Sequence, residues 1–158
     1  MKKFFIFIIS ILISFIPSFV GMAFSPNGEG ADMWYNMLIK SVLTPDGWVF
    51  AVVWPILFVL LGIALYLIIT DTKTKLSKAK AYWLFVAHMV LNALWTYLFF
   101  GAHLVGLALV ELFVLFGFSI WMARAFYQIR HSAGYLVIPY IVWQVFAMFL
   151  NGMILYLN

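Results

Sequence analysis

Long apolar runs dominate the pattern of the chain, and short polar stretches separate them. Four of these runs hold at most two charged residues each, and they cover residues 48–70, 81–101, 104–126 and 135–157. The hydrocarbon core of a bilayer requires roughly 20 apolar residues per helix, and within it every backbone amide must be hydrogen-bonded inside the protein. The pattern therefore predicts four membrane-spanning helices.

The first apolar run, residues 4–24, fits two interpretations. Two lysines precede it and small residues end it, so residues 1–23 also resemble a cleavable signal peptide. The run is nearer to a full span than to the roughly 7 to 15 apolar residues of a signal-peptide core. We therefore expect a fifth, retained span, with the signal peptide as the alternative.

The connection between the first two spans, residues 25–47, is the longest in the chain. Its middle, Asp32–Ser41, predicts a short helix on which Trp34 and Leu38 share one face, because they are one helical turn apart. Connections of more than about 12 to 15 residues in compact proteins often serve as lids or binding loops. The expected fold is all-α: one transmembrane domain, residues 1–158, built as a five-helix bundle with a short helix in its first loop.

Composition indicates that lipid is the solvent of this chain. It is 67% hydrophobic and 9% charged, whereas soluble domains carry about 25% charged residues. Of the nine lysines and arginines, all but Lys40 fall on one side of the threaded bundle. By the positive-inside rule we expect a multi-pass protein of the cell membrane, with its N-terminus in the cytoplasm and its C-terminus outside. The first connection is then an external lid loop, and the net charge of +4 indicates topology, not nucleic-acid binding.

Side chains that could carry out hydrolytic or metal chemistry are sparse. The chain has no cysteine, and its histidines, His88, His103 and His131, are far apart. Glu111 is the only carboxylate inside a predicted span. These residues lack the ligand spacing of a metal site. We therefore expect no metal site and no required cofactor.

Aromatic residues, 20% of the chain, offer a different kind of site. Trp54 and Trp95 are each about six residues, or some 9 Å at about 1.5 Å per residue, below the predicted outer face, and Trp143 is deeper. Together with Trp34 in the loop, they could wall a cavity that opens outward. Ordinary packing of the helix bundle is an equally good interpretation of the same residues.

Helical spacing places several of these residues on inward faces. His88, Asn92, Trp95 and Phe99 share one face of the third span, and an asparagine facing lipid is costly. If the third and fourth spans form a hairpin that turns near residue 102, Asn92 and Glu111 lie at the same depth. The sequence therefore predicts a structural polar pair between these two side chains.

Four motifs in order carry a resemblance to a known family. They are Trp34-Tyr35-x-x-Leu38-x-Lys40, Pro45-x-x-Trp48-x-Phe50-x-x-Val53-Trp54, Leu91-Asn92-x-x-Trp95-x-x-x-Phe99-Phe100, and Pro139-Tyr140-x-x-Trp143-x-x-Phe146-Ala147-x-x-Leu150-Asn151. The chain resembles the TspO/MBR family, which includes tryptophan-rich sensory proteins and translocator proteins, also known as peripheral-type benzodiazepine receptors. The motifs span most of the chain.

The resemblance implies a five-helix bundle, often a homodimer, with a pocket below the first loop. That pocket binds porphyrins (protoporphyrin IX or heme-like tetrapyrroles), and in some members sterols or isoquinoline- and benzodiazepine-type molecules. By matched position, the resemblance implies a ligand-binding set of Trp34, Leu38, Phe50, Trp54, Asn92, Trp95, Phe99, Trp143, Phe146 and Ala147. The sterol motif proposed near the family's C-terminus lacks its basic residue here, because only Leu157 and Asn158 follow Tyr156.

Three functions fit these features. The first is a membrane receptor or carrier that binds a flat hydrophobic ligand, foremost a porphyrin. The second is an enzyme that degrades bound porphyrin with light and oxygen, in which Trp54 and Trp143 would be the catalytic residues. The third is a regulatory subunit that binds a partner protein through close helix contacts.

Overall fold

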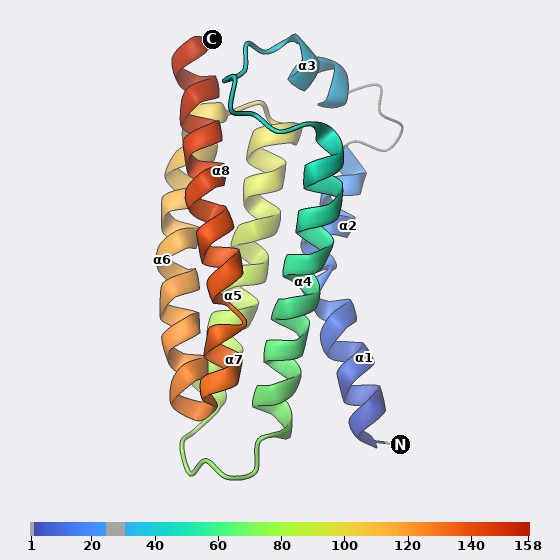
Figure 1. The fold of residues 1–158 in the computed structure, drawn as a ribbon, viewed down its shortest axis with the longest axis vertical. Coiled ribbons are helices and arrows are strands. Elements are labelled where there is room, and N and C mark those ends of the chain that lie inside the picture. The colour runs from blue at the N-terminus through green and yellow to red at the C-terminus, as the bar shows by residue number, and fades with distance from the viewer. Residues whose placement is uncertain (1, 25–30) are drawn as a thin grey trace.

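The computed structural model describes residues 2–24 and 31–158, and helices make up most of that part of the chain (Figure 1). The helices, in chain order, are α1 Lys2–Ser14, α2 Ile16–Phe24, α3 Ala31–Met37, α4 Gly47–Thr70, α5 Ala79–Thr96, the π-helix η1 Tyr97–Gly101, α6 Val105–Ile129, α7 His131–Tyr135 and α8 Ile138–Leu157. No strand occurs among the described residues.

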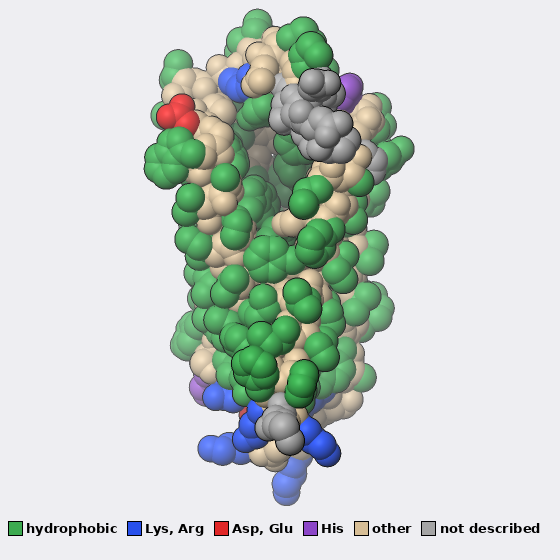
Figure 2. Space-filling view, turned by 90° about the vertical axis from the view of Figure 1, so that its right-hand side faces the viewer, with side chains coloured by type: hydrophobic (Ala, Val, Ile, Leu, Met, Phe, Trp, Pro, Cys, Tyr) green, Lys and Arg blue, Asp and Glu red, His purple; other side chains and the backbone are tan. Residues whose placement is uncertain are grey.

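Among the described residues, five helical segments are long and apolar enough to cross a membrane, which confirms the predicted all-α membrane fold. They are Lys2–Ala23, Gly47–Thr70, Ala79–Gly101, Val105–Ile129 and His131–Leu157. Figure 1 shows them as an upright bundle in which α3 lies across one end, and the two chain termini lie at opposite ends. The lysines and arginines visible in Figure 2 gather at the end away from α3, and only one lies near α3.

The first span is broken, whereas the sequence predicted one continuous helix over residues 4–24. α1 ends at Ser14 and α2 begins at Ile16. Pro17 explains the break, because proline has no amide hydrogen to bond within a helix and its ring crowds the preceding turn. The break lets the two halves take different neighbours: α1 packs along α4, whereas α2 packs against α5 and η1.

The contact between α1 and α4 is close. The Ser14 hydroxyl donates a 2.7 Å hydrogen bond to the Phe58 carbonyl oxygen, and both Ser14 and Gly62 are buried. A Cβ atom placed on Gly62 would lie 2.8 Å from the Cα atom of Ile11. The absence of a side chain at residue 62 therefore allows the two backbones to approach.

The fifth span also differs from the prediction of one helix over residues 135–157. It begins with the short helix α7 and continues as α8, with a break at Leu136 and Val137. Pro139 lies in the first turn of α8, where its missing amide hydrogen does no harm. The preceding turn cannot continue smoothly into that proline, so the helix is interrupted just before it.

The short helix in the first loop is shorter than the predicted Asp32–Ser41 and ends at Met37. The Lys40 ammonium donates hydrogen bonds to the carbonyl oxygens of Asn36 and Leu38, which stops the helix at this point. Beyond it, the Asn158 side chain accepts a hydrogen bond from the Ile39 amide and donates one to the Ile39 carbonyl, both at 3.0 Å. The end of α8 thereby holds the loop.

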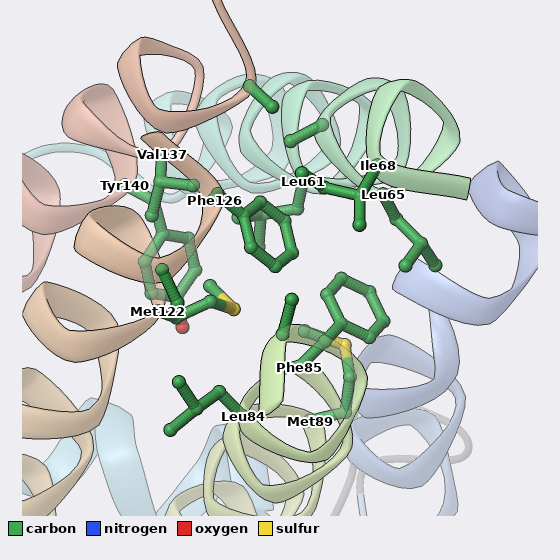
Figure 3. Packing of buried hydrophobic residues seen from close by; sticks show 14 of the residues in the cluster. Leu61, Leu65, Ile68, Leu84, Phe85, Met89, Met122, Phe126, Val137 and Tyr140 are labelled. Carbon is green, nitrogen blue, oxygen red and sulfur yellow. The ribbon is translucent and has the colours of Figure 1, made fainter. Parts of the chain in front are cut away.

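The buried apolar side chains form two clusters. The larger one lies between α4, α5, α6 and α8 in the half of the bundle away from α3, and Figure 3 shows side chains such as Leu61, Phe85 and Met122 meeting there. The smaller one, which we call the lid cluster, lies beneath α3 and contains Phe99 and Ile154 with Trp34 packed on them. The space between the two clusters holds the candidate site.

Candidate ligand site

A cavity of about 500 Å³ lies in the half of the bundle nearer α3. Its walls come from α2, α4, α5 and η1, and consist of Pro17, Ser18, Gly21, Met22, Phe50, Ala51, Trp54, Pro55, Phe58, Asn92, Trp95, Thr96 and Phe100. Figure 2 views the side of the molecule on which α1 and α2 lie, and shows the surface hollowed in its upper part. The volume is in the range of small-molecule sites, roughly 300 to 1,000 Å³.

The cavity exists because α2 and α4 separate in this half of the bundle. The break before Pro17 turns α2 toward α5, so the part of α4 nearer α3 loses the close neighbour that the rest of α4 has in α1. Pro55, inside α4, adds a second irregularity. Because proline cannot donate to the carbonyl four residues earlier, the Ala51 oxygen is left without its helical partner in the cavity wall.

Aromatic rings line the cavity from α4, α5 and η1. On α4, the ring of Trp54 stacks on Phe58, with centroids 5.7 Å apart and planes 24° from parallel. On α5, Trp95 stacks on Phe99 of η1 at 5.3 Å. The Trp95 indole donates a 3.3 Å hydrogen bond to Asn151 of α8, which fixes the orientation of its ring. Flat aromatic side chains in the lining suit a flat, apolar ligand.

The π-helix η1 at the end of α5 directs two neighbouring aromatic side chains to different places. The Ala102 amide donates to the Tyr97 carbonyl five residues back, and such turns are frequent at functional sites. Phe100 reaches the cavity wall, while the neighbouring Phe99 joins the lid cluster beneath α3. The π-helix η1 therefore contributes both to the cavity wall and to the cluster beneath α3.

No charged side chain lines the cavity among the described residues. Its polar side chains are those of Ser18, Asn92 and Thr96. The Thr96 hydroxyl already donates to the Asn92 carbonyl at 3.1 Å. An anionic group therefore has no cation to neutralise it inside the walls.

The predicted polar pair between Asn92 and Glu111 does not form. The Asn92 amide instead donates a hydrogen bond to the Tyr140 hydroxyl of α8. Both Glu111 oxygens are buried without a hydrogen-bond partner among the described residues. Equal depth in a hairpin does not fix which way each helix face points, and the longer tyrosine side chain reaches Asn92 from α8.

The structure brings four residues of the predicted ligand-binding set onto the cavity wall: Phe50, Trp54, Asn92 and Trp95. Ala147 lines a smaller adjoining space. Trp143 lies behind the wall, edge-on to Trp54 with ring centroids 6.4 Å apart, and Phe146 contacts Trp143. Their contact with a ligand stays a prediction.

The remaining three residues of the set, Trp34, Leu38 and Phe99, belong to the lid cluster. The Trp34 ring meets Phe99 edge-on at 5.6 Å and stacks on His103 at 4.1 Å. His103 has a φ of 56°, an uncommon value for a residue with a side chain. These contacts place α3 directly on the end of the hairpin between η1 and α6.

Sequence reasoning missed the contribution of α2 to the cavity. Ser18 and Gly21 line it, and a Cβ atom on Gly21 would lie 3.2 Å from the Thr96 side chain. The only signal in the sequence is a polar and a small residue placed one turn apart, shortly after Pro17. That signal is weak because the same run also contains Ser10 and Ser14.

Comparison with known proteins identifies the chain's relatives. The sequence pattern of the TspO/MBR family matches residues 6–157. The tryptophan-rich protein TspO of Chlorobaculum tepidum is 34% identical, over 89% of this chain and 87% of that protein. The human translocator protein is 35% identical over 84% of this chain and 78% of its own length. The tryptophan-rich sensory protein of Cereibacter sphaeroides is 30% identical, over 89% of both chains.

Proposed function

Because the chain belongs to the TspO/MBR family, we propose that it is a membrane receptor or carrier for a flat hydrophobic ligand, and that this ligand is a porphyrin. The observation that carries the proposal is the cavity of about 500 Å³ with aromatic rings from three helices in its lining. Apolar, aromatic walls with a few placed polar groups are typical of small-molecule sites. The resemblance noted in the sequence points to tetrapyrroles as the ligand class, with isoquinoline- and benzodiazepine-type molecules as smaller occupants.

The lining also suggests how a porphyrin would sit. Its ring system is flat and apolar, which matches the faces of Trp54 and Trp95, whereas its carboxylates need water or a cation. Burying an unpaired carboxylate among apolar walls would cost several kcal/mol. The described wall residues carry no charge, so the carboxylate edge should lie at the open side of the cavity, in water or among lipid headgroups.

Equilibrium titration of the purified protein with protoporphyrin IX, followed by tryptophan quenching, tests the proposal. We expect saturable binding of one porphyrin per chain. Protoporphyrin IX dimethyl ester, which lacks both carboxylates, should bind at least as tightly, because the walls offer no cation for them. Quenching that rises without saturation would contradict the proposed function, and tenfold weaker binding of the ester would contradict the proposed orientation.

The proposed function includes an orientation in the membrane, with α3 and the cavity on the outer side. The chain has no cysteine, so single cysteines can report each face. Val42 is fully exposed beside α3 and Leu76 is 56% exposed in the loop between α4 and α5. A membrane-impermeant maleimide added to intact cells should label Val42→Cys, and label Leu76→Cys only after permeabilisation. The reverse pattern would show that the bundle is inverted.

A further inference from the structure

An exposed group of aromatic rings lies where α5 and α6 pack together, in the half of the bundle away from α3. The ring of Trp83 meets Phe118 at 5.7 Å and Trp121 at 6.1 Å between centroids. Trp83 is 55% exposed and Trp121 is 45% exposed. We call these three residues the tryptophan face. It shares no residue with the lining of the ligand cavity, so it is a separate surface.

Lys80 lies against the tryptophan face. Its ammonium is over the Trp121 ring, 5.1 Å from the centroid, and such a contact between a cation and an aromatic ring is attractive. Among the residues that the structure describes, this ammonium has no carboxylate or carbonyl partner. The nearby Lys78 ammonium differs, because it donates hydrogen bonds to the carbonyl oxygens of Ile69 and Asp71. Lys80 therefore remains able to bind an anion from outside the protein.

A second cation belongs to the same surface. Arg124 is exposed and comes three residues after Trp121, so the two side chains share one face of α6. In the described part of the chain, Asp71 is the only acidic side chain at this end of the bundle, and its carboxylate accepts hydrogen bonds from the Lys73 and Thr74 amides. Figure 2 shows the basic side chains gathered at this end. The surface thus carries positive charge that the protein itself does not neutralise.

The surroundings of the two cations indicate an amphiphilic partner. Exposed tryptophans near the end of a membrane helix typically lie at the level of the lipid headgroups. Val86 and Val90 follow Trp83 on the same side of α5, toward the middle of the span, and are 60% and 61% exposed. Cations at headgroup depth, followed by an apolar strip, match a molecule with an anionic head and an acyl chain.

We propose that the tryptophan face, with Lys80 and Arg124, binds one anionic glycerophospholipid. The phosphate lies between the two cations, and an acyl chain lies along Trp83, Val86 and Val90. A phosphatidylcholine fits less well, because the cations repel its trimethylammonium group. This site is independent of the proposed porphyrin function and of which end of the bundle faces the cytoplasm.

Native mass spectrometry of the purified protein in detergent tests the proposal. Titration with dioleoylphosphatidylglycerol and with dioleoylphosphatidylcholine gives a dissociation constant for the first bound molecule of each lipid. We expect phosphatidylglycerol to bind at least about fivefold more tightly, the preference that one cation near an anionic headgroup commonly gives. Lys80→Gln should reduce this preference to less than about twofold, whereas Lys80→Arg should retain it. Equal binding of the two lipids to the unmodified protein would overturn the proposal.

Matched variants separate a defined site from general attraction. Lys75 is an exposed lysine in the loop at the same end, so Lys75→Gln removes the same charge and should keep the preference. Equal losses in Lys75→Gln and Lys80→Gln would overturn the site. Trp121→Leu should weaken phosphatidylglycerol binding, whereas Trp48→Leu, at a 67% exposed tryptophan of the other end, should not; equal effects would also contradict the site.

A soluble competitor distinguishes a lipid from a free phosphate. Glycerol 3-phosphate has the same anionic group but no acyl chain. Added in large excess over the lipid, it should leave the bound phosphatidylglycerol in place, because it makes no contact with the apolar strip. Displacement of the lipid by glycerol 3-phosphate would overturn the lipid assignment and indicate a site for soluble phosphates.

Discussion

Replacing Trp54 with leucine should weaken the binding of protoporphyrin IX about 30-fold. Trp54 lines both the large cavity and the smaller space that adjoins it, and its ring is aligned by stacking on Phe58. A central aromatic anchor in a binding site commonly contributes about 2 kcal/mol, which corresponds to that factor in the dissociation constant. Leucine keeps the site apolar but removes the flat face. The measurement is the same equilibrium titration as for the unmodified protein.

A matched substitution on another face controls for general effects of losing a tryptophan. Trp83 is 55% exposed and contacts Phe118 and Trp121, away from both spaces. Trp83→Leu should bind porphyrin as the unmodified protein does. The porphyrin affinity of Trp143→Leu should lie between those of the other two variants, because the Trp143 ring packs edge-on against Trp54. Equal loss of affinity in Trp54→Leu and Trp83→Leu would contradict a site on α4.

Introducing valine at Gly62 should destabilise the fold by about 3 kcal/mol, near the upper end of what overpacking usually costs. A Cβ atom there would lie 2.7 Å from the Ile11 side-chain Cδ1, 2.8 Å from the Ile11 Cα and 2.9 Å from the Ser14 hydroxyl oxygen. A flexible side chain could move aside, but the Cα atom moves only if α1 as a whole separates from α4. That movement would also break the Ser14–Phe58 hydrogen bond. Thermal unfolding in detergent, followed by loss of the monodisperse protein, would measure the effect.

Gly117 provides the matched control for this substitution. It lies within α6, and a Cβ atom placed on it would have no other atom within 4 Å. Gly117→Val makes the same chemical change in a helix of similar length, so its stability should stay within about 0.5 kcal/mol of the unmodified protein. Similar unfolding temperatures for the two variants would show that the contact between α1 and α4 is not tight.

The helices and their membrane character could be predicted because long apolar runs have few other stable arrangements in a bilayer. The interruptions were harder to place. Pro17 and Pro139 are visible in the sequence, yet a proline can be absorbed in a membrane helix with only a small bend. Whether the helix breaks depends on the neighbouring helices. For α2 that neighbour is α5, a contact that no local pattern encodes.

The aromatic part of the site was more predictable than its polar part. Trp54 and Trp95 lie on inward faces at similar depth, and depth follows directly from counting residues. The partner of Asn92 depends instead on helix rotation, which the count leaves free, and it proved to be Tyr140.

The hollow between α2 and α4 has a consequence for how affinity must be expressed. It opens on the lateral side of the bundle in the half nearer α3, so in a bilayer the end of the opening toward α3 lies near the headgroups and the rest of it faces acyl chains. A porphyrin, the ligand proposed above, dissolves in the membrane, so the protein would sample it at its mole fraction in lipid and not at its total aqueous concentration. Two laboratories that use different amounts of detergent or lipid would then report different dissociation constants for an identical site. Constants referred to the membrane phase should agree between them.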